Sequence, residues 1–477
     1  MNLGLISLCI PVIVIILAMT TKRIITALVV GILAGGILLA GGNIINGCIY
    51  AVEHIVKSIA SEESVYIIMF LFIFGAFGEI MALSGGISGF ANLANKYVKT
   101  EKGALGAVWL VTIFTFIDCC FHGIAAGTIG KALIDKVKGS KEKLAFVLNV
   151  TSCLLIILIP FGTTYVGYII GVINSSLNKA GLKISAYNLY LKSIPFNFYA
   201  IIMIFVSIGI IIFNLKFDSV VNRLSNIKDD EEYQGHEHNH EAHEQSEFGE
   251  KASPRPLNLI LPLVLLITAT FFFFWYTGKG KGHGFLGAIM NAEFEKSILI
   301  SAVITIVITT IFYLFQKIPM KKIESSFLSG GNEMMPPIIV LVLSWGLSSI
   351  IEDLGFVKFI TNNIGPQIPA MLIPVVIFLI GCAASYFMGS AWGTWALLMP
   401  IAIPLAVTSN SSLPLVIGAV LSGGSLGDNA SPLGETAILS STIAEVPLMK
   451  HVKTILPYSI ASIIIAAILF VIATFII

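Results

Sequence analysis

The chain has 477 residues, of which 56% are hydrophobic and 12% are charged, and its mean hydropathy is +0.92. Because soluble globular proteins carry about 25% charged residues, the composition excludes a soluble domain and indicates a polytopic membrane protein with the lipid bilayer as its partner. The net charge is +1, and the lysines and arginines lie in short loops. This pattern excludes nucleic acid as an expected partner.

We expect an all-α fold, because a helix crosses the hydrocarbon core in about 20 apolar residues. Full-length candidates lie near residues 3–19, 24–41, 64–83, 193–214, 257–276, 297–315, 336–354 and 455–477. The six cysteines mostly lie within apolar runs without paired spacing, which favours small buried hydrophobes over a disulfide framework.

Two pairs of apolar segments are interrupted by glycine, proline and polar residues: 103–135 with 144–177, and 370–407 with 413–447. In the first pair, DCCFHG (118–123) separates two apolar arms of about 14 residues, which suits a re-entrant hairpin. The following segment is interrupted at Pro160 to Thr164 and is expected to form a discontinuous transmembrane helix.

The second pair of segments repeats the first. Aligning Gly85 with Gly355 places DCCFHG on MGSAWG (388–393). Two extra residues in the next loop then place PFGTT (160–164) on PLGET (432–436), so that proline, glycine and threonine coincide. The sequence therefore predicts two structural repeats.

The charges flanking the hairpins predict that the repeats are inverted. Lysines surround the first hairpin, whereas TNNIGPQIP and AVTSNSS around the second carry no charge. By the positive-inside rule the first hairpin has both ends in the cytoplasm and the second is upside down. We expect about ten crossings plus two hairpins, with both termini outside and the cytoplasmic membrane of a bacterium as the location.

The only long polar stretch, residues 216–256, is predicted to be a cytoplasmic linker between a first repeat at 1–215 and a second at 257–477. Four histidines in it allow a metal-binding interpretation, but without paired cysteines or ordered geometry we favour a solvated flexible linker: His236, His238, His240 and His243.

Inverted repeats with discontinuous helices are typical of secondary transporters, in which half-helix ends and exposed carbonyls form an ion site near the midplane. Ionisable groups at membrane depth are costly and mark such sites, so Asp428 and Glu435 in GDNASPLGET are the leading candidates, including as Na⁺ ligands. A buried carboxylate binds either a cation or a proton, which is in itself an exchange mechanism. The alternative role of Asp428 is to cap a helix.

Further candidates are short polar residues near the interruptions: Ser425, Asn429, Ser431, Thr436, Asp118, His122, Thr163, Thr164, Ser390 and Thr394. Asp118 has capping of the second hairpin arm as its structural alternative. A lone histidine such as His122 is often a hydrogen-bonded structural residue. Trp392 and Trp395 are expected to be packing residues.

The segments GSAWGTWALLMPIAIPLA (389–406) and GGSLGDNASPLGETAILSSTIA (423–444) resemble the NhaC-type Na⁺/H⁺ antiporter family within the ion-transporter superfamily. The resemblance implies cation-coupled antiport, with Asp428, Ser431, Glu435 and Thr436 as the matching polar positions. Glu435 departs from the aspartate that is common there.

The first hypothesis is therefore a Na⁺/H⁺ antiporter without a cofactor other than its ions. The alternative is a Na⁺- or H⁺-coupled carrier of an amino acid or carboxylate. A channel is disfavoured by the enclosed midplane site. An intramembrane enzyme is disfavoured because no nucleophile with an adjacent base accompanies the carboxylates. The sequence leaves open whether the chain forms a homodimer.

Overall fold

The computed structural model describes residues 3–214, 255–280, 284–290, 292–359 and 369–476, and all regular elements in these ranges are helical. The predicted linker, with its four histidines, lies almost wholly outside the described residues. Seven described helices are long and apolar enough to cross a membrane, or up to nine if each of two bent pairs forms one span. The all-α membrane fold is confirmed at this level.

The elements of the first half follow the predicted order, with further short or amphipathic helices between the apolar ones. They are α1 (Leu3–Thr21), α2 (Ile24–Leu39), α3 (Ile44–Ile59), α4 (Glu62–Leu83), α5 (Gly86–Tyr97), α6 (Glu101–Thr115), α7 (Cys119–Val137), α8 (Lys141–Asn149), the π-helix η1 (Val150–Leu155), the 3₁₀-helix η2 (Ile156–Leu158), α9 (Thr164–Lys179), α10 (Ala186–Ser193), η3 (Ile194–Phe196) and α11 (Phe198–Phe213).

The second half contains a further series of helices. Its elements are α13 (Leu257–Gly278), α14 (Gly284–Met290), α15 (Phe294–Phe315), α16 (Met320–Glu333), α17 (Met335–Asp353), α18 (Phe356–Phe359), η6 (Ala370–Leu372), α19 (Ile373–Met388), α20 (Ala391–Thr408), α21 (Leu413–Ala430), α22 (Glu435–Ile443) and α23 (Leu448–Ile476). Gly85 and Gly355, which the sequence aligns, both adopt a left-handed backbone, with φ of 71° and 84°.

The interruptions lie close to the predicted positions, and the one in the first hairpin is shorter than predicted. Helix α9 begins at Thr164 after a non-helical stretch at 159–163, and α22 begins at Glu435 after one at 431–434. In the first hairpin the break covers only 116–118, because most of DCCFHG forms the first turn of α7. Since Asp118 and Ser390 are the N-caps of α7 and α20, the helix starts shift the hairpin alignment by two positions.

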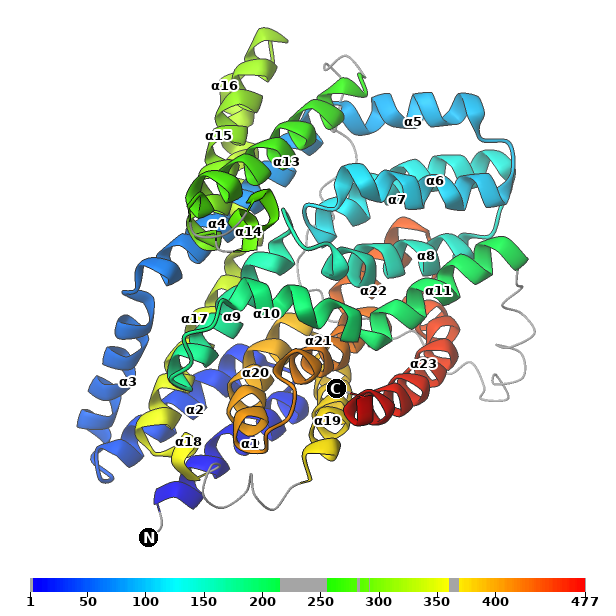
Figure 1. Cartoon of the computed structure of the whole chain (residues 1–477). Coiled ribbons are helices and arrows are strands. Elements are labelled where there is room, and N and C mark those ends of the chain that lie inside the picture. Colours follow the sequence, from blue (N-terminus) through cyan, green and yellow to red (C-terminus); the bar gives the residue numbers. More distant parts are fainter. Residues whose placement is uncertain (1–2, 215–254, 281–283, 291, 360–368, 477) are drawn as a thin grey trace.

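The helices of the two halves interleave, as Figure 1 shows. Helix α4 packs against α15 and α16, and α17 packs against α2 and α3. In the same way α7 packs against α22 while α20 packs against α9. Each hairpin therefore contacts the broken helix of the other half, and the core between them is almost completely buried.

The first hairpin has one short arm, α6, whereas its other arm, α7, has 19 residues. In the second hairpin, Ala370–Met388 and Ala391–Thr408 are each long and apolar enough to cross a membrane by themselves. The arm α6 has only 15 residues. The re-entrant course of both hairpins stays a prediction.

Candidate functional site

Asp428 lies at the end of α21, two residues before the helix ends. Its side chain is 2% exposed, and its Oδ1 accepts a hydrogen bond from the backbone N–H of Ala391, 3.3 Å away in the first turn of α20. The chain beyond the break folds back, because Thr436 Oγ1 donates to the Asp428 carbonyl oxygen over 2.6 Å. The carboxylate therefore lies where a helix end, a hairpin tip and an interrupted helix meet.

The other predicted residues of this segment are buried and hold its backbone in place. Ser425 Oγ donates to the Leu421 carbonyl over 2.8 Å, and Ser431 Oγ donates to the Tyr386 carbonyl over 2.7 Å. Ser431 thereby ties the break of α21 to the end of α19. Three of the candidates, Ser425, Ser431 and Thr436, thus bond to backbone carbonyls.

Asn429 connects the two halves through side-chain hydrogen bonds. Its Nδ2 donates to Asn149 Oδ1 over 2.8 Å, and Asn149 Nδ2 donates back to the Asn429 carbonyl over 3.0 Å. Tyr199 on α11 donates its hydroxyl to Asn429 Oδ1 over 2.7 Å. All three side chains are fully buried, so this network fixes α21 against the broken helix of the first half.

Glu435 is exposed, unlike Asp428, and contacts the first half of the chain. Its Oε1 accepts a hydrogen bond from Cys120 Sγ at 3.0 Å, at the start of α7. The charge of Glu435 also acts on Asp428 across the break. The structure thus brings both predicted carboxylates to the tip of a hairpin, each to a different one.

Asp118 has the capping role that the sequence offers as its structural alternative. Its Oδ2 accepts from the backbone N–H groups of Cys120 and Phe121 at 2.8 and 3.2 Å. Its Oδ1 accepts from Thr164 Oγ1 at 2.8 Å. Asp118 therefore caps α7 and ties the tip of the first hairpin to the start of α9.

His122 is fully buried and uses both ring nitrogens in hydrogen bonds to threonine hydroxyls. Nδ1 lies 2.6 Å from Thr115 Oγ1, and Nε2 lies 2.9 Å from Thr151 Oγ1. These bonds join the two arms of the first hairpin to η1. The structural interpretation of His122 accounts for these contacts.

The remaining predicted residues lie at helix starts. Thr163 caps α9 by accepting from the Val166 N–H at 3.1 Å, and Ser390 caps α20 by accepting from the Gly393 N–H at 3.2 Å. Thr394 Oγ1 donates to the Ser390 carbonyl over 2.8 Å. The side chains of these three residues therefore form hydrogen bonds that stabilise the starts of the helices.

Sequence reasoning did not select Tyr165, although it directly follows the interruption before α9. Its ring packs between Trp392 and Trp395 of α20, with centroids 4.7 and 5.4 Å away. Within the described part of the chain its buried hydroxyl has no hydrogen-bond partner, and the same holds for Ser152 Oγ on η1 and Ser440 Oγ on α22. Buried polar atoms of this kind are commonly satisfied by a ligand or ordered water.

A small cavity adjoins the tip of the first hairpin and contains two acidic residues that were not selected. Glu79 lies near the end of the apolar helix α4, and Glu333 belongs to α16, which has too few apolar residues to be predicted as a span. The cavity is lined by Gly75, Gly78, Glu79, Ala82, Asp118, Phe121, Ile124, Glu333 and Met334. Two further acidic residues, Glu79 and Glu333, therefore line the same cavity as Asp118.

Comparison with known proteins shows to which family the chain belongs. The Na⁺/H⁺ antiporter family model matches residues 155–475, which contain most of the interrupted segments. An uncharacterized protein of Haemophilus influenzae is 29% identical over 464 residues, covering 93% of this chain and 86% of its own.

Two relatives named as antiporters are similar over a shorter region. The malate-2H(+)/Na(+)-lactate antiporter of Bacillus subtilis is 31% identical over 161 residues, which is 32% of this chain and 33% of that protein. The Na(+)/H(+) antiporter NhaC of the same organism is 27% identical over 161 residues, 32% of this chain and 34% of its own. Because the family model covers more than half of the chain, the chain belongs to the Na⁺/H⁺ antiporter family.

Proposed function

We propose that the chain is a secondary active transporter that exchanges Na⁺ for H⁺ at Asp428 and Glu435. The observation that carries the proposal is the position of Asp428: a carboxylate 2% exposed at the end of α21, beside the first turn of α20. A carboxylate in such surroundings needs either a cation or a proton.

The chemistry of the surrounding groups supports a hard cation. Carboxylate, hydroxyl, amide and backbone carbonyl oxygens are the ligands that such ions prefer. Glu435 lies beyond the break and contributes a second negative charge. A sodium ion near Asp428 would replace its proton, so that loading one ion releases the other.

The proposal includes two inverted repeats, 1–215 and 257–477, joined by the 216–256 linker. The reciprocal packing of α7 with α22 and of α20 with α9 supports a two-fold relation between them. The lysine-rich ends of the first hairpin would face the cytoplasm, with both chain termini outside. A Lys138→Cys variant in intact cells should resist a membrane-impermeant maleimide until the cells are opened, and labelling from outside would overturn this orientation.

A coupled carrier of a carboxylate is the second candidate. The similarity to an antiporter named for malate and lactate favours it. An amino acid is the other substrate class that the sequence leaves open. In either case the half-helix N-termini would hold the substrate carboxylate while Asp428 and Glu435 serve the coupling ion.

Flux measurements in proteoliposomes distinguish these candidates. A pH gradient is imposed across liposomes that contain the purified protein, and its collapse is followed after NaCl, LiCl or KCl is added. Malate, lactate, arginine and glutamate are then tested as additional substrates. Collapse by Na⁺ alone supports the antiporter. Collapse that requires an organic substrate supports the second candidate, and no response to any of them contradicts both.

A further inference from the structure

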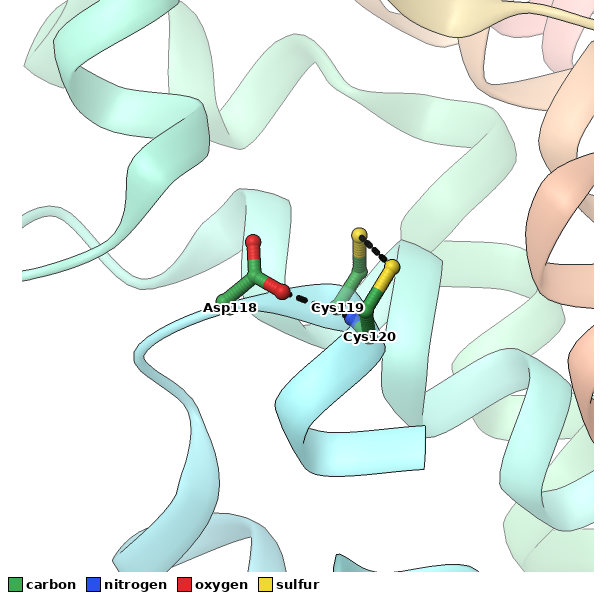
Figure 2. Close-up of side chains that lie close together, drawn as sticks. All are labelled: Asp118, Cys119 and Cys120. Atoms are coloured by element: carbon green, nitrogen blue, oxygen red, sulfur yellow. Dashed lines mark hydrogen bonds between the residues drawn. The ribbon is translucent and has the colours of Figure 1, made fainter. Parts of the chain in front are cut away.

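Two adjacent cysteines form the first turn of α7 at the tip of the first hairpin. Their sulfur atoms lie 3.9 Å apart and point to the same side of the helix, as Figure 2 shows. With Asp118 they form a group whose ligand atoms all lie within 4.8 Å of one another. Neither cysteine has a role in the proposed exchange of Na⁺ and H⁺.

Glu435 adds a carboxylate from the other half of the chain. Its Oε1 lies 3.0 Å from Cys120 Sγ. The neighbouring Cys119 is buried, with 2% of its surface exposed. Cys120 is half-buried and Glu435 is exposed, so the group is accessible from one side. Asp118 is already engaged, because its two oxygens cap α7 and bind Thr164.

The spacing of the sulfurs suits one metal ion held by both. Two thiolates bound tetrahedrally to Zn²⁺ at about 2.3 Å lie about 3.8 Å apart. The observed 3.9 Å therefore needs almost no rearrangement. A disulfide is a poorer fit, because adjacent Cα atoms lie about 3.8 Å apart whereas bridged cysteines need about 4.4 Å or more.

We propose that Cys119, Cys120 and Glu435 bind one thiophilic divalent metal ion, such as Zn²⁺ or Cd²⁺, with water as the fourth ligand. Binding replaces two thiol protons with two metal–sulfur bonds and releases both protons to solvent. The cavity beside the tip of the first hairpin is lined by three acidic residues, Glu79, Asp118 and Glu333. Their negative charge would attract a divalent cation toward the site.

A bound metal would join the first hairpin to the start of α22. Since the two cysteines belong to the first half and Glu435 to the second, the ion would hold the two halves together at their contact. Any transport step that separates α7 from α22 would then stop. The inhibitory effect rests on the proposed transport function, whereas metal binding does not.

The first experiment measures binding without transport. The purified full-length protein, with the four linker histidines changed to alanine, is titrated with Cd²⁺ in detergent, and the thiolate-to-cadmium charge-transfer absorbance is recorded. One equivalent should bind with this absorbance. Cys119→Ser and Cys120→Ser should each lower the affinity by about tenfold or more, equivalent to about 1.4 kcal/mol.

Two cysteines elsewhere serve as matched controls. Cys153→Ser removes a buried thiol, and Cys48→Ser removes an exposed one; both should bind Cd²⁺ like the parent protein. Glu435→Gln should keep the absorbance but lower the affinity. Three outcomes would overturn the proposed site. The affinity for Cd²⁺ could be unchanged in both Cys119→Ser and Cys120→Ser, it could fall equally in the control variants, or it could be unchanged in Glu435→Gln. Elution of each variant as a single detergent-solubilised species shows that the serine did not unfold it.

The second experiment measures the consequence for transport. In proteoliposomes, Cd²⁺ should inhibit flux through the parent protein but have little effect on the Cys120→Ser variant. Each flux rate with Cd²⁺ is divided by the rate of the same protein without Cd²⁺. Equal inhibition of the two proteins would refute the metal as a bridge between the halves. Absence of any flux would count against the proposed function and leave the binding result decisive for the site.

Discussion

At the scale of single residues, two buried aspartates near helix ends have different surroundings. Asp118 uses both oxygens in hydrogen bonds that cap α7 and bind Thr164. Asp428 accepts one backbone N–H at the longer distance of 3.3 Å. The first arrangement is typical of a structural cap, whereas the second leaves more capacity for an ion.

Replacing Asp428 with asparagine removes the charge but keeps an oxygen for the Ala391 N–H. We expect Asp428→Asn to fold and to lose Na⁺-dependent proton movement by about tenfold or more, since the charged ligand for Na⁺ is gone. Proteoliposome flux measures this. Asp135→Asn, an exposed position on α7, is the control and should transport normally. An Asp428→Asn variant as active as this control would remove Asp428 from the mechanism.

Replacing Asp118 tests the contrast between the two aspartates. Asp118→Ala leaves two helix N–H groups and the Thr164 hydroxyl without their acceptor, so it should destabilise the protein by about 1–2 kcal/mol. Asp118→Asn should recover most of that loss, because asparagine is also a good N-cap. Thermal unfolding in detergent measures both. If both variants unfold at the same temperature as the parent protein, the capping role of Asp118 is wrong.

The role of a side chain can be predicted from the sequence when its hydrogen-bond partners are only a few residues away. The capping alternative for Asp118 could be stated from the sequence, because its partners at Cys120 and Phe121 are two and three residues away. The contact of Glu435 with Cys120 spans 315 positions, and no local pattern encodes it. The sequence selects Glu435 only as an unusual group in an apolar chain, and it does not select Cys120.

At the scale of helices, the predicted spans agree with the structure where apolar runs are long. The predicted 64–83, 257–276 and 336–354 become Glu62–Leu83, Leu257–Gly278 and Met335–Asp353. The amphipathic helices α3 and α16 were not predicted, because Glu53, His54 and Lys57 interrupt the apolar run of α3 and α16 is mostly polar. A search for long apolar runs does not detect helices of this kind.

Close contact between α19 and α21 depends on glycine. A Cβ at Gly423 would lie 2.6 Å from the Phe378 carbonyl oxygen, whereas a Cβ at Gly106 on α6 would meet nothing within 4 Å. We expect Gly423→Ala to separate the two helices and to lower the unfolding temperature in detergent. Gly106→Ala is the matched control and should be neutral or stabilising by up to about 1 kcal/mol, because alanine favours helix.

The two glycine variants can also contradict this packing account. It fails if Gly423→Ala and Gly106→Ala shift the unfolding temperature equally. Their flux in proteoliposomes is a second readout, because α21 carries Asp428 and α19 ends at the tip of the second hairpin. Gly423→Ala should therefore lose activity, and Gly106→Ala should keep it.

At the scale of the whole molecule, ion pairs join the two halves at the end of the first hairpin. Glu445, in the loop after α22, pairs with Lys131 on α7 and Lys141 at the start of α8. Glu142 pairs with Lys450 at the start of α23 over 2.8 Å. The sequence predicts the repeats and their basic loops, but which loops meet depends on how the halves interleave.

The pKa of Glu445 makes this connection sensitive to acid. Hydrogen bonds from Lys131 and then Lys141 lower the pKa of the Glu445 carboxyl to about 2. Since the folded pKa lies below the ordinary value of 4.5, the ion pairs contribute their stability above about pH 4.5 and lose it as the pH falls toward 2.

Glu445→Gln removes the ion pairs at every pH. The difference in unfolding temperature between the parent protein and this variant should be constant from pH 7 to 5 and should shrink below about pH 4.5. Glu324→Gln, on α16, is a control that should show no such trend. A difference that stays constant into the acid range would contradict the assigned ion pairs.

The most direct test of competition between Na⁺ and H⁺ is proton release on ion binding. Purified protein in weakly buffered detergent solution is mixed with NaCl or KCl, and the change in pH is recorded. We predict proton release with Na⁺, less with K⁺, and none in an Asp428→Asn, Glu435→Gln double variant. Equal release from the parent protein and the double variant, or no release with Na⁺ at any starting pH between 6 and 9, would contradict competition at these carboxylates.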